Sequence, residues 1–566
     1  MEYTPEQNKI FQFVESGFGN GIIDAVAGAG KTSTILECAR YVSTSSKALF
    51  CAFNKSIAKQ INIRLGEKGL SNITVKTIHA LGWQMLVASK LSVRGIDLQE
   101  RKYEVLLKSP EMQYALQGYY EKIIRLNGLE PERAQNDKQE AFAIKNLLFK
   151  INRRLLDINQ KYRATLSKLT LDDFKKVVSH FGIFSEVEVK KKKLETELTQ
   201  YLKCTEILLN AGNELSKNSM IMDFTDMIYL PYQWNIQSTV KYDFIFIDEC
   251  QDLSPAQIAV VLKFGKESSR ILAVGDPRQS IYGFAGADIE SFDKVKRNTK
   301  AKQFPLTSCF RCPTKVIELA RSIRTDIVGA KQEEGNVEFI TFEKTVDIAR
   351  PGDLIISRLK APLVILVFSF IDKNVSVNIH EDEVRDVINE IKSIFKQEEL
   401  NLTISSILGG FETLKTDVLQ RWRWIIKKDS ERIVNAAERT LYVESETGYL
   451  KQRLEFLNRK YELWKLTCST LAEIIEKIRS YVSASENSIR LWTIHRAKGL
   501  ENDRVFILDY DELPLGRLDQ KEWERVQELN LKYVAITRAR KELFLIEAEK
   551  VEVLQEKSLF DILPFD

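Results

Sequence analysis

Residues Ala25 to Thr32 read AVAGAGKT, and their types and order suit the binding of a nucleotide polyphosphate. Small side chains at positions 27–30 allow backbone N–H groups to close around phosphate oxygens at the start of a helix. Lys31 supplies a positive charge for the β- and γ-phosphates, and the hydroxyl of Thr32 is a ligand for Mg²⁺. The pattern usually begins with glycine, whereas Ala25 stands at that position here. The loop alone does not separate kinases, GTPases, transporters and motors.

A second set of polar residues follows two short apolar runs farther along the chain. The run FIFI ends in Asp248 and Glu249, which predicts two carboxylates at the carboxyl edge of a parallel sheet. Asp248 suits Mg²⁺ coordination, and Glu249 suits the orientation or deprotonation of an attacking water. After the next run, Gln279 offers an amide that can sense the γ-phosphate. Tyr282 and Phe284 follow, and the residues alone leave open whether they stack on unpaired bases or pack in a core.

Short β-rich runs alternate with helical segments, which is typical of parallel sheets built from βα units. These runs cover residues 48–53, 244–247, 270–274, 354–356, 505–509 and 543–546. Two stretches rich in Leu, Lys and Glu interrupt the alternation, at about 88–217 and 380–488. We expect both stretches to be helical insertions into α/β lobes.

Three local patterns could be either functional or merely structural. The lysine run at 190–193 is expected to be a solvated helix face. The RWRW segment at 421–424 either grips a nucleic acid or forms an amphipathic helix with two buried tryptophans. Cys309 and Cys312 have C-x-x-C spacing, but no second pair lies nearby, which disfavours a metal or redox role.

Composition narrows the class of protein further. A chain of 566 residues with 44% hydrophobic and 29% charged residues is expected to form two to four soluble globular domains. The net charge is only +4, so any binding of nucleic acid must come from local patches. Seven scattered cysteines favour a reducing cytoplasm, and because the N-terminus is polar we expect no signal peptide. No run of 18 apolar residues is present, so no membrane span is expected.

Four longer motifs carry a resemblance to a known family. DECQD, GDPRQSIYGFAGA, WTIHRAKGLE and YVAITRAR together resemble superfamily 1 DNA helicases of the UvrD/PcrA/Rep type. DECQD and the FAGA ending are similar to the subgroup that includes F-box DNA helicases, although no F-box is evident. The resemblance spans Tyr3 to Ile546, with the motifs in the family order.

The resemblance implies an α/β fold of two RecA-like P-loop lobes with parallel sheets, each lobe carrying a mainly helical insertion. ATP and Mg²⁺ would lie between the lobes. The expected first lobe comprises 1–87 and 218–300, around the insertion 88–217. The expected second lobe comprises 301–379 and 489–566, around the insertion 380–488.

The same resemblance implies roles at the nucleotide. Gln7 would read the adenine, Phe310 would stack on it, and Glu501 would meet the sugar. Arg311 and Arg538 would act as two arginine fingers on the γ-phosphate. The full implied nucleotide site is Gln7, Ala27, Gly28, Ala29, Gly30, Lys31, Thr32, Ser33, Asp248, Glu249, Gln279, Phe310, Arg311, Glu501 and Arg538. Thr32 and Asp248 would hold Mg²⁺.

Positions on a single-strand DNA path are also implied. They are Asn54, Lys55, Thr77, His79, Tyr282, Phe284, Thr493 and His495. Three departures from the family pattern occur: Phe53 sits one residue late, Phe284 replaces a common Trp, and Ala285 replaces a frequent arginine. Taken alone, His79 and His495 are equally compatible with core or helix-end histidines.

We therefore expect an ATP-dependent single-stranded-DNA translocase and 3′→5′ DNA helicase, acting on single strands and tailed duplexes. One alternative is a translocase that strips proteins from single strands with little unwinding. Others are the motor of a helicase–nuclease or defence complex, with a nuclease or loading factor as protein partner, and a DNA-binding scaffold without turnover. We expect a cytoplasmic protein of bacterial or phage-like type, or one associated with the nucleoid, and no membrane partner.

Overall fold

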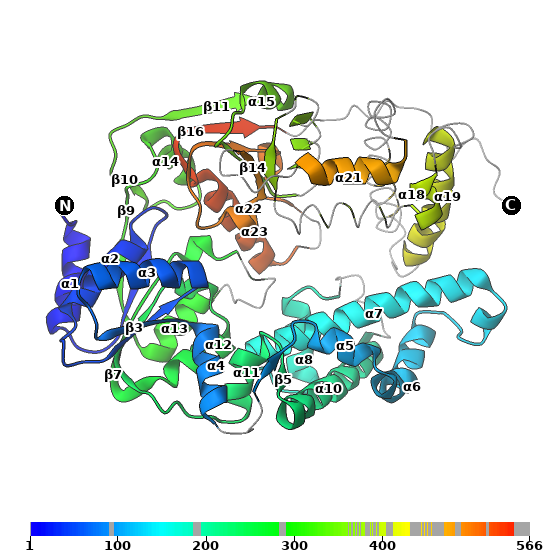
Figure 1. Ribbon diagram of the computed structural model, residues 1–566, viewed down its shortest axis with the longest axis horizontal. Helices are drawn as coiled ribbons and strands as arrows, with labels where there is room; N and C mark the ends of the chain where they lie inside the picture. Colours follow the sequence, from blue (N-terminus) through cyan, green and yellow to red (C-terminus); the bar gives the residue numbers. More distant parts are fainter. Residues whose placement is uncertain are drawn as a thin grey trace.

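The computed structural model folds the chain into two α/β lobes, one above the other at the left of Figure 1, with helices extending to the right. The residues that the structure describes are 2–89, 95–184, 194–281, 283, 290–359, 488–516 and 520–547, with pieces of 362–481. Among them, no helix has both the length and the apolar character needed to cross a membrane. The two lobes with parallel sheets confirm the predicted fold class.

The first lobe is built on a six-stranded sheet whose described strands all pair in parallel. In spatial order they are β3 (Ile73–Thr77), β2 (Ala48–Ala52), β6 (Tyr242–Ile247), β7 (Gly265–Gly275), β1 (Gly21–Ala25) and β8 (Lys302–Leu306). All five residues of β2 are buried, as expected for a strand covered by helices on both faces. Because β8 pairs along β1, the first sheet extends beyond residue 300, the boundary expected from the sequence.

Helices cover both faces of this sheet. They are α1 (Pro5–Ser16), α2 (Lys31–Cys38), α3 (Lys55–Glu67), α4 (Ile78–Ala88), α11 (Asp226–Gln233), α12 (Pro255–Leu262) and α13 (Ser291–Thr299). The parallel strands have their carboxyl ends at one edge, and the loops leaving β1, β6 and β7 meet there. This edge faces the second lobe.

The second lobe contains another six-stranded parallel sheet. In spatial order its strands are β11 (Asn336–Ile340), β16 (Ala539–Ile546), β15 (Asn502–Ile507), β12 (Leu354–Ser357), β14 (Ile489–Thr493) and β13 (Val377–Ile379). Its described helices include α14 (Thr314–Ala320), α15 (Phe342–Ile348), α22 (Ile494–Ala497) and α23 (Glu522–Ile536). A short parallel pair, β9 (Ser308–Cys309) and β10 (Val328–Gly329), lies in the segment that follows β8.

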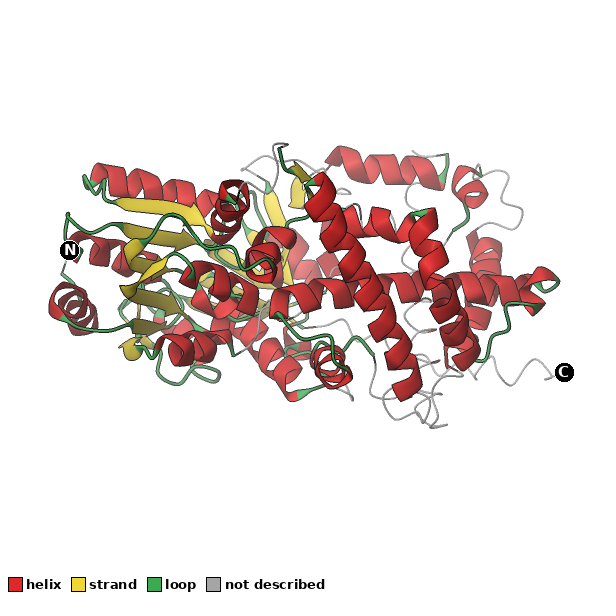
Figure 2. Cartoon of the chain, turned by 90° about the horizontal axis from the view of Figure 1, so that it is seen from below, coloured by secondary structure: helices red, strands yellow, loops and turns green. Residues whose placement is uncertain are grey.

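The first insertion is a helical unit with its own apolar core, seen as long helices at the right of Figure 2. Its helices are α5 (Lys102–Lys108), α6 (Pro110–Leu126), α7 (Lys138–Thr165), α8 (Leu171–His180) and α10 (Leu194–Ser219). The short strands β4 (Asp97–Leu98) and β5 (Ile221–Met222) pair where the unit leaves and re-enters the lobe. The lysine run at 190–193 lies outside the described residues.

A buried ion cluster joins this insertion to the first lobe. Lys102 Nζ lies 2.7 Å from Asp226 Oδ2. Arg163 Nη1 lies 2.7 Å from Asp223 Oδ1 and 2.8 Å from Asp226 Oδ1. The cluster contains two cations and two carboxylates, and each charge touches one of opposite sign.

The second insertion contributes α18 (Gln397–Asn401), α19 (Phe411–Ser430) and α21 (Leu471–Tyr481) among the described residues. The RWRW segment lies inside α19. Trp422 packs against the apolar core of the second lobe, and the ring of Trp424 lies 6.3 Å from that of Phe142 on α7. These contacts favour the amphipathic-helix interpretation, but both tryptophans are half-buried rather than buried, and Trp424 links the two insertions.

Candidate nucleotide-binding site

The loop between β1 and α2 takes the shape that its small residues predict. Gly30 has φ +75° and precedes α2, whose first turn has no side-chain cap, so its N–H groups are available to an anion. Gly28 has φ +69°, and a Cβ there would lie 2.6 Å from Arg311 Cβ and 2.9 Å from Cys309 Sγ. Glycine at position 28 therefore serves both the backbone turn and a close approach by the segment after β8.

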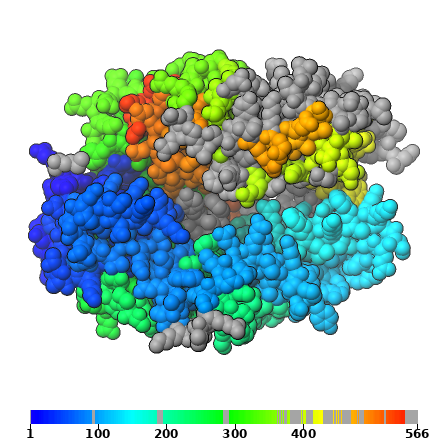
Figure 3. Space-filling model, in the orientation of Figure 1, coloured from blue at the N-terminus to red at the C-terminus, as the bar shows by residue number. Residues whose placement is uncertain are grey.

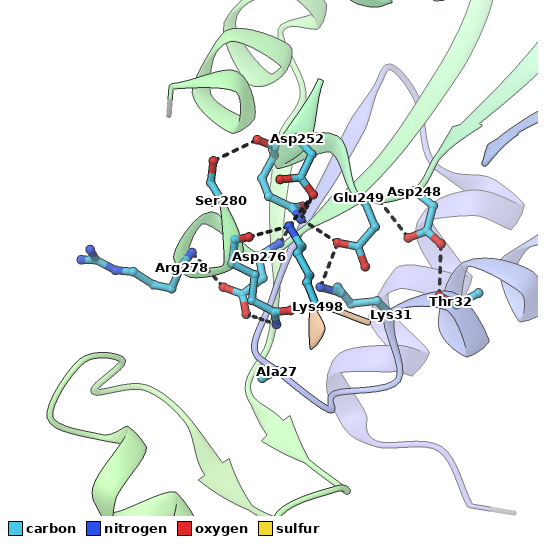
Figure 4. Close-up of polar contacts among 12 residues, drawn as sticks. Ala27, Lys31, Thr32, Asp248, Glu249, Asp252, Asp276, Arg278, Ser280 and Lys498 are labelled. Carbon is cyan, nitrogen blue, oxygen red and sulfur yellow. Dashed lines mark hydrogen bonds and ion pairs between the residues drawn. The ribbon is translucent and has the colours of Figure 1, made fainter. Parts of the chain in front are cut away.

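Lys31 and Thr32 face the two carboxylates at the end of β6 (Figure 4). Lys31 Nζ lies 3.3 Å from Glu249 Oε2, and Thr32 Oγ1 donates to Asp248 Oδ2 over 3.1 Å. Asp248 is 2% exposed, and the backbone N–H of Glu249 is its other donor among the described residues. Mg²⁺ at a nucleotide is bound by oxygen ligands, and the buried carboxylate of Asp248 and the neighbouring hydroxyl of Thr32 supply two of them.

Charge coupling sets the protonation of these groups. Burial acts to raise the pKa of Glu249, but Lys31 and then Lys498 outweigh it and hold that pKa below its ordinary value. Burial, followed by the charge of Glu249, raises the pKa of Asp248. Burial acts to lower the pKa of Lys31, but Glu249, Asp276 and Asp248 outweigh it and raise that pKa. Lys31 is thus held as a cation, and Asp248 is the carboxylate that most needs a partner charge.

A hydrogen-bond chain connects these residues to the second lobe. Gln251 Nε2 donates to Glu249 Oε2 over 2.6 Å, and the N–H of Asp276 donates to Gln251 Oε1 over 3.1 Å. Gln279 Nε2 donates to Asp276 Oδ2 over 2.7 Å. Lys498, from the second lobe, contacts Asp252 in Figure 4 and donates to the carbonyl of Gln279 over 2.5 Å.

The arginines form the facing wall. Arg311 Nε lies 2.5 Å from Glu501 Oε2, and Arg311 Nη1 donates to the carbonyl of Thr537 over 3.2 Å. Arg538 is 1% exposed and donates to the carbonyls of Val534 and Leu500 over 2.8 and 2.9 Å. Among the described residues, no carboxylate contacts it.

Burial, and then the neighbouring Arg311, lowers the pKa of Arg538 to about 9. A buried guanidinium without an opposite charge is costly, and an anion would relieve that cost. A buried cation without a carboxylate partner is expected at a position that binds a phosphate.

The two walls already touch through the loop. The N–H of Ala27 donates to the hydroxyl of Tyr533 on α23 over 2.9 Å, and the N–H of Phe310 donates to the carbonyl of Gly28 over 3.0 Å. Arg324, in the segment after α14, bridges Asp24 at 2.8 Å and Asp276 at 3.1 Å. The seam between the two halves runs across the face in Figure 3, with blue and cyan below it and green and orange above.

The residues implied for the base and sugar lie at the rim of this site. Gln7 is buried in α1, where Nε2 donates to Thr34 Oγ1 over 2.9 Å and Oε1 accepts from the N–H of Thr4 over 3.0 Å. Phe310 is 47% exposed, which leaves a ring face for stacking. Ser33 is exposed at the first turn of α2, and Ala27 and Ala29 are buried in the loop. Their contacts with a nucleotide stay predictions.

The implied DNA residues occupy matching places in the two lobes. Thr77-Ile-His79 joins β3 to α4, and Thr493-Ile-His495 joins β14 to α22. Thr77 Oγ1 caps α4 by accepting from the N–H of Ala80, and His79 meets Phe224 edge-to-face with ring centroids 6.4 Å apart. The same Thr-Ile-His sequence thus stands at a strand–helix junction on each side of the seam.

Of the remaining positions implied for DNA binding, some lie at helix termini and two lie outside the described residues. Asn54 caps α3 by accepting from the N–H of Ile57, and Lys55 is exposed beside it. Burial, then Arg358 and Lys498, lowers the pKa of His495 to about 4, which keeps it neutral. Tyr282 and Phe284 lie outside the described residues, so their role stays a prediction.

Cys309 and Cys312 are both buried and free. The N–H of Cys312 donates to Cys309 Sγ over 3.5 Å, and Cys309 packs under Gly28. Across the described part of the chain, no group of three or more His, Cys, Asp or Glu side chains is placed to hold a metal ion. Cys309 thus packs beneath the phosphate loop, while Cys312 Sγ donates to the carbonyl of Thr537 over 3.6 Å.

Sequence reasoning singled out Lys31, Thr32, Asp248, Glu249 and Gln279, and these lie together. It did not single out Gln251, Asp252, Asp276, Arg324, Lys498 or Tyr533. Four of the six stand inside the motifs DECQD, GDPRQ and HRAKGLE, and Tyr533 stands in YVAITRAR. These five residues lie two to five positions from a residue that was singled out in the same motif, and that proximity was the available signal.

Two helicase family models match this chain. The model of the UvrD/REP helicase N-terminal domain matches residues 4–300, and that of the UvrD-like helicase C-terminal domain matches residues 371–550. F-box DNA helicase protein 1 of Schizosaccharomyces pombe is 24% identical over 92% of this chain and 55% of its own length. A probable DNA helicase II homolog of Mycoplasma pneumoniae is 21% identical over 94% of this chain and 82% of its own length.

A shorter match reaches another kind of relative. The RecBCD enzyme subunit RecB of Buchnera aphidicola is 29% identical over 24% of this chain and 11% of its own length. The chain spans about half the length of the two F-box DNA helicases that it matches, 55% and 49%.

Proposed function

Because the chain belongs to the UvrD/Rep helicase family, we propose that it is an ATP-dependent DNA helicase that moves 3′→5′ along single-stranded DNA. The observation that carries this proposal is the pairing of opposite walls. Lys31, Asp248 and Glu249 lie on the first lobe. On the other side, Arg311 lies against Gly28 of the phosphate loop and donates to the carbonyl of Thr537, the residue next to Arg538.

The residues divide the work of ATP hydrolysis between the lobes. Lys31 and the first-turn N–H groups of α2 hold the β- and γ-phosphates. Thr32 and Asp248 would hold Mg²⁺, which would supply positive charge against the developing phosphate charge. When a polyphosphate draws Lys31 away, Glu249 loses its nearest cation and becomes a stronger base toward the attacking water. Gln279, held by Asp276, faces the γ-phosphate.

Charge across the seam couples this chemistry to motion. Arg538 lacks a carboxylate among the described residues, so a γ-phosphate gives it a partner only when the lobes are closed. ATP therefore binds the closed arrangement better, and hydrolysis with phosphate release removes that preference. If the junctions at Thr77 and Thr493 each hold one strand, alternation between the two states moves the strand.

The test measures ATP turnover with and without single-stranded DNA, and then unwinding of duplexes that carry either a 3′ or a 5′ tail. We expect stimulation by DNA and unwinding of the 3′-tailed duplex. Lys31→Ala is the matched control, because the β- and γ-phosphates lose their counter-charge and turnover should disappear. Stimulation with unwinding of the 5′-tailed duplex alone contradicts the polarity, and absence of turnover in the parent protein supports a scaffold.

The same test can also support a motor that depends on a protein partner. The match to RecB, named as a subunit of a larger enzyme, favours a motor that works with a protein partner such as a nuclease or a loading factor. Such a motor turns over ATP on single strands but unwinds poorly alone. Displacement of a protein block from a single strand without unwinding supports the stripping translocase. In each case the protein acts in the cytoplasm or at the nucleoid.

A further inference from the structure

One residue of the second lobe makes a contact that the nucleotide chemistry described above does not use. Tyr533 is fully buried on α23, and its hydroxyl accepts from the N–H of Ala27 over 2.9 Å. The two residues are 506 positions apart in the chain. Ala27 is one of the loop residues expected to close around phosphate oxygens, but its N–H is committed to Tyr533 in the structure. The first-turn N–H groups of α2 have no side-chain cap and are the ones left for a phosphate.

Backbone carbonyls in and just after the last turn of α23 accept hydrogen bonds from Arg311 and Arg538. The carbonyl of Tyr533 accepts from the N–H and the hydroxyl of Thr537, over 3.1 and 2.8 Å. The carbonyl of Val534 accepts from Arg538 Nε, and the carbonyl of Thr537 accepts from Arg311 Nη1. The turn that contacts the phosphate loop is therefore the turn that fixes both guanidinium groups.

The remaining contacts of α23 support a fixed geometry. Asn530 Nδ2 donates to the carbonyls of Pro277 and Ser280, over 3.3 and 2.9 Å, on either side of Gln279. Asn530 and Tyr533 are three residues apart and so lie on one face of the helix. A tyrosine ring has only two side-chain torsions, so a buried hydroxyl at its tip sets a distance with little freedom.

We propose that Tyr533 is a positioning residue that ties the phosphate loop to the turn carrying Arg538, and so sets the alignment of the two walls for hydrolysis. This inference rests on the proposed function, because it needs Arg538 to act on the γ-phosphate. Tyr533 itself touches the loop backbone and acts through Arg538.

The test is Tyr533→Phe, which removes the hydroxyl and keeps the ring. We expect DNA-stimulated kcat to fall about tenfold, with the KM for ATP and the affinity for a fluorescent ATP analogue changed by less than about twofold. The matched control is Tyr120→Phe, which removes a buried hydroxyl bonded to Asn152 Oδ1 over 2.6 Å inside the first insertion. The control should lower the Tm by a similar amount and leave kcat unchanged.

A double-mutant cycle isolates the link to Arg538. Adding Tyr533→Phe to Arg538→Ala should lower the residual turnover by less than about twofold, because the arginine that Tyr533 positions is already absent. A tenfold further loss overturns the proposal, as does a normal kcat in Tyr533→Phe. If Arg538→Ala alone turns over ATP normally, the proposed role of Arg538 fails instead, so the two failures are distinguishable.

Discussion

Two buried groups of charged side chains in this protein differ in how their charges are matched. In the cluster of Lys102, Arg163, Asp223 and Asp226, every charge lies within 2.8 Å of an opposite charge. At the nucleotide site, Asp248 contacts only a hydroxyl and a backbone N–H, and Arg538 on the facing wall contacts only carbonyls and a hydroxyl, among the described residues.

The difference teaches how to separate a structural charge cluster from a functional one. A buried pair that is fully matched holds elements together, and removal of one partner leaves a costly charge. A buried charge without a partner costs stability in the free protein and is compensated when a ligand brings the missing charge. Asp248 is thus suited to bind a cation such as Mg²⁺, and Arg538 is suited to bind an anion such as ATP.

The largest effect should come from Arg538→Met, which removes the unmatched cation and keeps side-chain volume. We expect ATP turnover to fall about 10³–10⁵-fold, the range for loss of an arginine finger. The free energy of unfolding should stay within about 1 kcal/mol of the parent or rise, because an unmatched buried charge has gone. Steady-state ATPase assays and urea denaturation measure the two quantities. A large loss of stability with normal turnover would place Arg538 among structural charges.

The next effect should come from Glu249→Gln. The amide keeps the shape but is a far weaker base, so we expect turnover to fall about 10²–10⁴-fold while ATP still binds. Equilibrium binding of a fluorescent ATP analogue and single-turnover hydrolysis check this expectation. Glu338→Gln, which alters an exposed pair with Lys344, is the matched control. Unchanged single-turnover hydrolysis in Glu249→Gln removes Glu249 from the water-activating role.

Arg163→Met tests the matched cluster. It leaves Asp223 buried without its cation, and we expect a loss of about 3–5 kcal/mol in the stability of the first insertion and lobe. Turnover by the folded protein at low temperature should stay within about threefold of the parent. Hydrogen exchange along α5, α7 and α11 locates the loss. Lys175→Met, in an exposed pair with Glu195, should cost no more than about 1 kcal/mol.

The smallest effect concerns His495, beside the cations Arg358 and Lys498. Its folded pKa of about 4 lies below the unfolded value near 6.5, so its contribution is present above pH 6.5 and is lost as the pH falls toward 4. The loss amounts to at most about 3 kcal/mol. Thermal unfolding of the parent and of His495→Gln, from pH 7.5 to 5, should show a steeper decline in the parent. Parallel curves would contradict the depressed pKa.

Several parts of this arrangement were predictable because they are local. The phosphate loop depends on the unit Gly21–Cys38, and the acids follow directly after β6, so both depend on short local segments and both lie where expected. The apolar strands β2, β6, β7, β12, β15 and β16 were found from continuous hydrophobic runs. The strands β3, β11 and β14 were missed, because polar residues alternate in ITVKT, NVEFI and IRLWT.

Other parts depend on contacts between distant segments, which no local pattern encodes. Lys102 lies in an ordinary charged helix, and only the docking of α11 buries it against Asp226. The bond from Ala27 to Tyr533 joins residues at opposite ends of the sequence. Trp422 and Trp424 are two positions apart, and the tertiary packing decides that one packs against the core of the second lobe while the other meets Phe142.

Helix α23 carries a thermodynamic consequence beyond the nucleotide site. Trp523 near its start stacks on His180 of the first insertion, with ring centroids 5.2 Å apart, and Tyr533 near its end holds the phosphate loop. Ten residues of helix separate these contacts by about 15 Å. If DNA on the insertion tightens ATP binding through this rod by some factor, then ATP must tighten DNA binding by that same factor. The total heat of forming the complex of protein, ATP and DNA, measured by calorimetry, should then be the same whether ATP or DNA is added first.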